Sequence, residues 1–132
     1  MMNNIPELSD LIGVPFVNHG RSISDGFDCY GLAIEVERRF GHKLDDAVYE
    51  YSVDSSFTEN APKIIKQMNK KVYKTTTPKA GDVVLFANNK GDMVHIGVIL
   101  NGDDFIHCDL NSVHINHLHT YFRKYYEVYT WR

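Results

Sequence analysis

A cysteine directly behind an aspartate is the residue of this chain best suited to nucleophilic chemistry. Asp28 is a typical helix N-cap, and the apolar spacing that starts at Leu32 places Cys29 in the first turn of the helix that follows. The positive end of a helix dipole favours a thiolate and is expected to lower the pKa of such a thiol. We therefore predict that Cys29 is a nucleophile. It needs a histidine to accept its proton and later to protonate a leaving amine.

Two of the seven histidines are the strongest candidates for that base. His95 opens the apolar segment 95–100, and His107 lies inside the apolar segment 105–108. A polar ring within an apolar strand needs a hydrogen-bond partner or a function. Histidines with a purely structural role are common in strands, so the argument depends on whether these two can meet.

The loop between the two segments decides whether the histidines meet. Asn101-Gly102 is a strong hairpin signal. A two-residue loop would put His95 and His107 on opposite faces of the hairpin. A three-residue loop, 101–103, makes Gly97 face His107 and places the two histidines on one face as diagonal neighbours, roughly 7–8 Å apart. Gly97 has no side chain and leaves room over His107, so we predict the three-residue loop.

The order of the elements predicts an α+β fold, with helices first and antiparallel strands afterwards. A helix of about three turns begins at Cys29 and stops at Gly41, and a second covers about residues 59–70, with Ser56 or Thr58 as its cap. A short helix is expected near 6–12 in an otherwise loose N-terminal arm. The expected strands are 72–76, 82–87, 95–100, 105–108, 113–118 and 127–131.

Length and composition exclude several classes of function. The 132 residues suit a single domain, 1–132. The net charge of -3, from 14 basic and 17 acidic residues, argues against a nucleic-acid binder. No apolar run is long enough for a membrane span. The N-terminal residues lack the pattern of a secretory signal, so we expect a protein that is cytoplasmic when made.

The remaining cysteine and histidines suggest no further chemistry. Cys108 falls on the opposite strand face from His107 and is expected in the core, although a bridge to Cys29 stays open. The spacing of His114, His117 and His119 matches neither a helical pair nor a zinc finger, so no metal is expected. The aromatic residues between Tyr121 and Tyr129 are expected to be core rather than a substrate platform.

Four motifs in this order and spacing resemble the NlpC-type family of papain-like cysteine peptidases, which degrade cell walls. The resemblance runs from about Gly13 to the C-terminus, and four linked motifs are more specific than any one alone. They are Asp28-Cys29-Tyr30-Gly31-Leu32, Gly81-Asp82-Val83-Val84-Leu85-Phe86, His95-Ile96-Gly97-Val98 and Phe105-Ile106-His107. The resemblance implies a papain-like fold, with N-terminal helices packed on a five- to six-stranded antiparallel sheet.

The resemblance also implies a role for each site residue. Cys29 would be the nucleophile and His95 the general base and then the general acid, while His107 would orient the His95 ring. The backbone N–H of Cys29 would help to stabilise the oxyanion. The reaction would be hydrolysis of a peptidoglycan stem peptide, typically between D-glutamate and the diamino acid, through a thioester. No cofactor is implied.

Three further residues are expected at the substrate. Asp28 matches the family aspartate that helps to receive the free amino end of a stem peptide. Phe16 stands where many members have a tyrosine, and Tyr30 stands where many have a serine. Both positions usually bear on substrate recognition or on the oxyanion site, so the resemblance leaves the exact substrate preference of this chain open.

The large aromatic residue after the cysteine most resembles the version of the family found in phage tail proteins and prophages. This version implies phage tail proteins as partners besides peptidoglycan, and a virion-associated protein as the second possible location. Two other functions stay open at this point. One is acyl or amide transfer by the same thiol, and the other is a non-catalytic module for tail assembly or binding.

Overall fold

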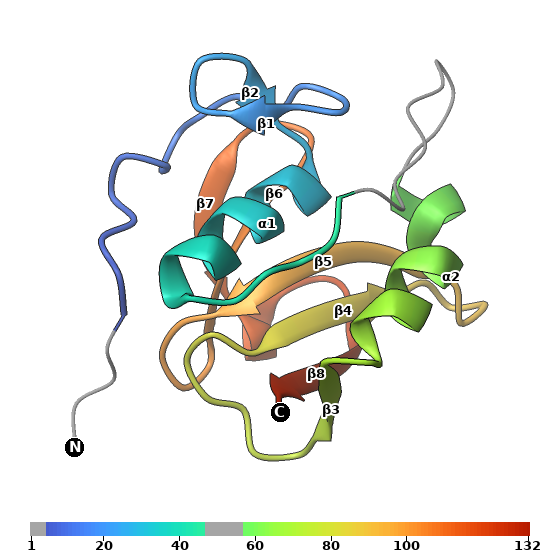
Figure 1. The fold of residues 1–132 in the computed structure, drawn as a ribbon. Coiled ribbons are helices and arrows are strands. Elements are labelled where there is room, and N and C mark those ends of the chain that lie inside the picture. The colour runs from blue at the N-terminus through green and yellow to red at the C-terminus, as the bar shows by residue number, and fades with distance from the viewer. Residues whose placement is uncertain (1–4, 47–56) are drawn as a thin grey trace.

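Two helices pack against a six-stranded antiparallel sheet, as the α+β prediction requires (Figure 1). The computed structural model of the chain describes residues 5–46 and 57–132. The sheet contains β3 (Val72–Thr75), β4 (Val83–Ala87), β5 (Met93–Ile99), β6 (Asp104–Cys108), β7 (Val113–His117) and β8 (Tyr125–Trp131). A 3-10 turn, η1 (Leu118–Thr120), follows β7. None of the helices among the described residues combines the length and the apolar character needed to cross a membrane.

The first helix, α1 (Cys29–Phe40), has the bounds that its cap residues predict. The Asp28 carboxylate accepts a hydrogen bond of 2.7 Å from the Gly31 backbone N–H, which satisfies one donor of the first turn. Gly41 ends the helix with φ 92°, a left-handed conformation that glycine adopts without a steric penalty. The helix buries Leu32, Ala33 and Val36, so the predicted apolar face is confirmed.

The second helix, α2 (Phe57–Met68), starts and ends two residues before the predicted range of 59–70. Its apolar face is confirmed, since Ile64 and Met68 are buried and Ile65 packs against the core. Ser56, one of the two expected caps, lies outside the described residues. Thr58, the other, lies inside the helix. Both helices contact β5, which therefore forms the centre of the helix–sheet interface.

The strands follow the predicted order along the chain, but their order in the sheet is β3-β8-β4-β5-β6-β7. The C-terminal strand thus enters between β3 and β4, with pairs such as Lys74–Tyr129 and Val84–Val128. Apolar residues fill both faces. The helix side includes Leu85, Ile96 and Ile106, and the other side holds Val84, Phe86, Ile99, Phe105, Leu118, Tyr121 and Val128.

The β5–β6 hairpin has the predicted three-residue loop. Val98 pairs with Ile106 and Ile99 with Phe105. The Leu100 N–H donates to the Asp104 carbonyl over 2.9 Å, so residues 101–103 form the loop. By this register Gly97 faces His107, and a β-carbon on Gly97 would lie 3.3 Å from the His107 β-carbon. The space over His107 therefore depends on glycine, as the sequence suggested.

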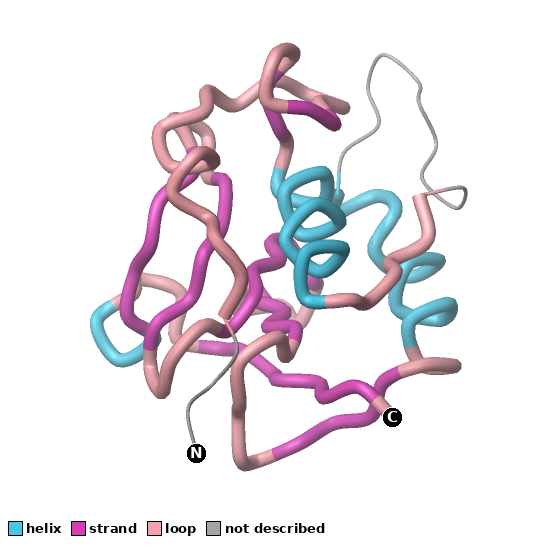
Figure 2. The backbone as a smooth tube through the Cα atoms, turned by 60° about the vertical axis from the view of Figure 1, so that its left-hand side comes forward, coloured by secondary structure: helices cyan, strands magenta, loops and turns pink. Residues whose placement is uncertain are grey.

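The N-terminal arm contains no helix at 6–12, so that prediction is wrong. Residues 9–13 form successive turns, with Leu11 N–H donating to Leu8 O and Val14 N–H to Leu11 O. The buried side chains of Leu8 and Leu11 come from these turns rather than from a helical face. The arm then runs beside β7, where Gly13 N–H donates to Val113 O (Figure 2).

A small hairpin that the sequence did not predict precedes α1. It consists of β1 (Arg21–Ser22) and β2 (Gly26–Phe27), and an isolated bridge joins Phe16 to Phe27. The segment was expected to be rich in turns, and two-residue strands leave no periodic signal to detect. The hairpin matters for function because it leads directly into Asp28 and the start of α1.

Candidate active site

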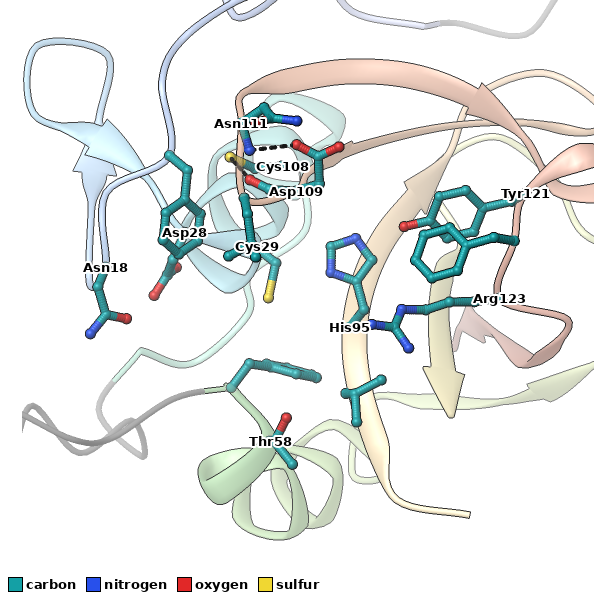
Figure 3. A pocket seen from close by; sticks show the side chains of 15 residues that line it. Asn18, Asp28, Cys29, Thr58, His95, Cys108, Asp109, Asn111, Tyr121 and Arg123 are labelled. Carbon is teal, nitrogen blue, oxygen red and sulfur yellow. Dashed lines mark hydrogen bonds between the residues drawn. The ribbon is translucent and has the colours of Figure 1, made fainter. Parts of the chain in front are cut away.

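A cavity of about 370 Å³ lies where the N-terminus of α1 meets β5 and the end of β6 (Figure 3). Cys29 and His95 both line it, from the helix and from the sheet respectively. The N-terminal arm contributes Phe16, and the segment before β8 contributes Tyr121 and Arg123. The cavity thus brings together parts of the chain that lie far apart in the sequence.

Cys29 occupies the place where β5 and β6 separate. Every second residue of β5, and Leu100 directly after it, directs its backbone N–H toward β6. Val98 and Ile96 belong to this set. Val98 still pairs with Ile106 on β6, whereas the Ile96 N–H donates a hydrogen bond to the Cys29 sulfur. The divergence of two strands therefore creates the slot that holds the sulfur against the sheet.

The two predicted histidines meet across β5 and β6. The distance from His95 Nε2 to His107 Nδ1 is 2.7 Å, and the rings are nearly perpendicular, at 79°. His95 has 7% of its surface exposed and His107 none. The hydrogen bond uses Nε2 of His95, so Nδ1 is the ring nitrogen left for the cavity, into which Cys29 also points (Figure 3).

The sequence did not predict that a third polar side chain, Asn116, hydrogen bonds to His107. His107 Nε2 lies 2.7 Å from Asn116 Oδ1 on β7. In the β6–β7 register His107 faces His114, so Asn116 is its diagonal neighbour, just as His107 is for His95. The alternation of Val113–His117 placed Asn116 on the same face as His114. The signal was therefore present, but it required the register of a second hairpin.

The thiol does not have the lowered pKa that the helix terminus suggested. Burial raises the pKa of Cys29 well above its usual range, and the negative charge of the adjacent Asp28 adds to the rise. The hydrogen bond from Ile96 acts in the opposite direction but does not compensate. The helix dipole favours an anion here, yet the loss of solvent outweighs it. The raised pKa leaves Cys29 as a neutral thiol at physiological pH.

Both histidines are neutral at physiological pH. Burial, the neighbouring His107 and the positive charge of Arg123 together lower the pKa of His95 to about 3, with burial the largest cause. Burial also lowers the pKa of His107 to about 4, against the effect of its bond to Asn116. A neutral imidazole can accept a proton, so His95 has the charge state that a general base needs.

Asp28 lies at the cavity but already has several partners. Its Oδ1 accepts from the Gly31 N–H and from Arg21 Nη1, each over 2.7 Å, and its Oδ2 accepts from the His19 N–H over 3.1 Å. The Arg21 ion pair offsets the negative charge of this carboxylate. A contact between Asp28 and a substrate amino group therefore stays a prediction, and Asp28 has a structural role in any case.

Phe16 and Tyr30, the two residues that depart from the family pattern, lie in different places relative to the cavity. Phe16 lines the cavity, where its ring offers an apolar wall without a hydroxyl. Tyr30 points away, and its hydroxyl donates to the Asp45 carbonyl over 2.6 Å while only 1% of its surface is exposed. Tyr30 is not among the residues that line the cavity, so the expected direct contact with substrate does not fit this geometry. Consecutive helix residues project about 100° apart, which explains why Cys29 and Tyr30 diverge.

The second cysteine is buried, as expected, and both cysteines are free. Cys108 Sγ donates to the Phe27 carbonyl over 3.2 Å, so the bridge to Cys29 that the sequence left open is not formed. The three C-terminal histidines each pair with an aspartate: His114 with Asp109, His117 with Asp104 and His119 with Asp103. Within residues 5–46 and 57–132, no group of three or more ligating side chains is arranged to hold a metal ion.

The aromatic residues before β8 differ from the expectation that they form core. Tyr121 is buried in the second core cluster, yet it also borders the cavity. Phe122 is 71% exposed at the rim, and the Arg123 guanidinium lies 4.9 Å from its ring centre. This segment is therefore a wall of the cavity that combines an apolar surface with a positive charge.

Comparison with solved structures gives the same fold. The NlpC/P60 domain of the peptidoglycan hydrolase SagA is 24% identical, with a TM-score of 0.58, and the match covers 89% of this chain and 87% of that one. An NlpC/P60 family protein from Bacillus cereus ATCC 10987 is 21% identical, with a TM-score of 0.63, over 92% of this chain and 36% of that one. A lipoprotein-like NLP/P60 family protein from Staphylococcus aureus Mu50 is 18% identical, with a TM-score of 0.62, over 93% and 42%.

The sequence itself gives the family assignment. No curated protein matches the chain. A family model does match, over residues 13–132, and this range contains Cys29, His95, His107 and Asn116. Since that model covers nearly the whole chain, this protein belongs to the NlpC/P60 family.

Proposed function

We propose that this protein is a cysteine peptidase that hydrolyses peptidoglycan stem peptides at the bond between D-glutamate and the diamino acid. The observation that carries the proposal is that Cys29 and His95 line one cavity while the His95 ring hydrogen bonds to His107. Family membership supports the substrate class, because NlpC/P60 proteins are typically peptidoglycan hydrolases. The phage-tail association suggested by the sequence stays a prediction.

The reaction follows from the charge states of the site. The neutral thiol of Cys29 transfers its proton to His95 Nδ1 while the sulfur attacks the carbonyl carbon of the scissile amide. The resulting oxyanion lies near the Cys29 N–H, one of the first-turn donors that have no carbonyl partner within the helix. Collapse breaks the C–N bond, and His95 gives its proton to the leaving amine.

The second half of the reaction releases the acyl group. Water gives a proton to His95 Nδ1 and attacks the thioester carbonyl, and the thiolate of Cys29 then leaves and recovers that proton. The net change is one amide and one water converted into one amine and one carboxylic acid. The base is regenerated in the neutral form in which it started.

Digestion of a panel of purified stem peptides, with products identified by mass spectrometry, tests this proposal. We expect two fragments from the wild-type protein, one ending in D-glutamate and the other starting at the diamino acid. Cleavage at a different amide would correct the bond, and transfer of the acyl group to an added amine in place of water would favour a transferase. No cleavage anywhere in a broad panel would contradict the peptidase proposal.

The positive charge of Arg123 suits a substrate that carries carboxylates. Arg123 borders the cavity and lies close enough to His95 and Tyr121 to affect the pKa of both. Arg123→Gln is expected to raise KM about tenfold or more for a stem peptide with a free carboxylate next to the scissile bond, because a hydrogen bond to a charged group contributes about 1.5–3 kcal/mol. Lys124→Gln, a change in the exposed neighbouring residue, should leave KM unaltered.

Steady-state kinetics on the carboxylate peptide and on its carboxamide analogue check this prediction. The Arg123→Gln variant should lose the preference for the carboxylate. An equal rise in KM for both peptides would show that Arg123 does not recognise the charge.

A further inference from the structure

A line of polar side chains crosses three strands of the sheet and ends at Asn116. His95 lies on β5, His107 on β6 and Asn116 on β7, and each is the diagonal neighbour of the next on the same face. Both contacts along this line are 2.7 Å long. Aromatic rings surround His107, with those of Phe105 and Tyr121 centred 4.5 and 5.2 Å away. The His114 ring is centred 4.7 Å away, but its Nε2 pairs with Asp109, and the close contact of His107 Nε2 is the one with Asn116 Oδ1.

The chemistry of Asn116 Oδ1 determines where the protons lie. An amide oxygen only accepts, so His107 must donate from Nε2. A neutral imidazole carries one proton, which leaves His107 Nδ1 as an acceptor. His95 must then donate to it from Nε2. The single proton of a neutral His95 is thereby used, and Nδ1 keeps the lone pair that faces the cavity.

We propose that Asn116 is a positioning residue that sets the tautomers of both His107 and His95 and so keeps His95 Nδ1 free to accept the proton of Cys29. This inference deepens the proposed function, on which its catalytic consequence rests. The opposite arrangement shows why it matters. If the side-chain amide donated to His107 Nε2, then His107 would donate from Nδ1, and His95 would carry its proton on the nitrogen that has to act as base.

The tautomers are measured without any substrate, by long-range ¹H–¹⁵N correlation spectra of the imidazole side chains at pH 7. In the wild-type protein we expect both His95 and His107 to be protonated at Nε2 and bare at Nδ1. Finding a proton on His95 Nδ1 in this protein would overturn the inference. Because this readout needs no turnover, it stands or falls separately from the peptidase proposal.

Two substitutions at one position separate proton control from simple packing. Asn116→Asp keeps the accepting oxygen and is expected to preserve both tautomers and to hold kcat within about tenfold of wild type. Asn116→Leu has a similar size but no polar atom, and His107 should then populate both tautomers. We expect this variant to lose about 10- to 100-fold in kcat with little change in KM, a loss of the size found when the hydrogen-bond partner of a metal-bound histidine is removed.

Ile115→Ala is the matched control on the same strand. Ile115 is 46% exposed and points to the other face of β7, so the imidazole spectra and kcat should remain as in wild type. Unchanged tautomers in Asn116→Leu would contradict the inference. So would an Asn116→Asp variant that is as impaired as Asn116→Leu, because the accepting oxygen would then not be what matters.

Discussion

Replacing His95 with glutamine is expected to lower kcat/KM for stem-peptide hydrolysis by about 10³- to 10⁴-fold. General-base catalysis alone contributes about 10²- to 10⁴-fold. The effect should lie toward the upper end here, because burial raises the pKa of Cys29 and leaves very little thiolate at neutral pH. Without His95 the thiol loses the neutral imidazole that shares its cavity and is placed to take its proton.

Glutamine substitutions at two other histidines are matched controls for this measurement. His107→Gln retains an oxygen that can accept a hydrogen bond from His95 Nε2. It should lower kcat/KM by less, about 10- to 100-fold. His119→Gln changes an exposed ring on η1, far from the base in the sequence and paired with Asp103, and should have no effect. A His95→Gln variant with more than a tenth of wild-type kcat/KM would show that another group accepts the proton.

Gly31→Ala is expected to destabilise the fold by about 3 kcal/mol or more, although alanine normally stabilises a helix relative to glycine by about 1 kcal/mol. The sign reverses because of a close approach between α1 and the chain before β1. A β-carbon on Gly31 would lie 2.0 Å from the Gly20 carbonyl oxygen, 2.8 Å from Arg21 Nη1 and 3.1 Å from Asp28 Oδ1. A backbone carbonyl cannot move away as a flexible side chain can.

Thermal and urea unfolding measure this effect. For a domain of this size, about 3 kcal/mol corresponds to a fall in Tm of roughly 10 °C. Gly91→Ala is the control, because a β-carbon there would meet nothing within 4 Å while φ is +88°. Gly91→Ala should lower the free energy of unfolding by about 1–2 kcal/mol, which is the strain of an alanine in the left-handed conformation. Equal losses in the two variants would contradict the role that we assign to the contact with Gly20.

Local sequence signals were sufficient to predict the helix that carries the nucleophile and the hairpin that carries the base. Asp28 and Gly41 carry their own capping chemistry, so both ends of α1 could be read from neighbouring residues. The register of the β5–β6 hairpin followed from one loop and one glycine, since Gly97 had to face His107. Such features depend on a few residues that are close in sequence, and these predictions are confirmed.

Three features that the sequence did not predict share a cause, because each depends on contacts between distant segments. The β-branched and aromatic residues of 127–131 predict a strand, but nothing in them indicates that β8 pairs with both β3 and β4. The pKa of Cys29 was judged from the helix terminus alone, whereas the burial that dominates it arises from packing against β5. Asn116 was missed because its position relative to His107 required the β6–β7 register.

The expectation for Tyr30 failed for a different reason, because helix geometry alone could have corrected it. A residue next to Cys29 in a helix points about 100° away from it. Tyr30 accordingly packs against Phe57, with ring centres 6.1 Å apart, and its hydroxyl donates to the Asp45 carbonyl, so Phe57 lines the cavity but Tyr30 does not. Tyr30 therefore bears on the packing of α1 against Phe57 and does not line the cavity itself.

The most direct test of the account asks which of the two thiols performs the reaction. Cys29→Ala and Cys108→Ala are compared with wild type for release of the diamino-acid fragment from a defined stem peptide, followed by mass spectrometry. We predict no detectable cleavage by Cys29→Ala, and cleavage within about tenfold of wild type by Cys108→Ala, because Cys108 Sγ is directed at the Phe27 carbonyl. Cleavage that survives in Cys29→Ala, or that depends on Cys108 instead, would contradict the central claim.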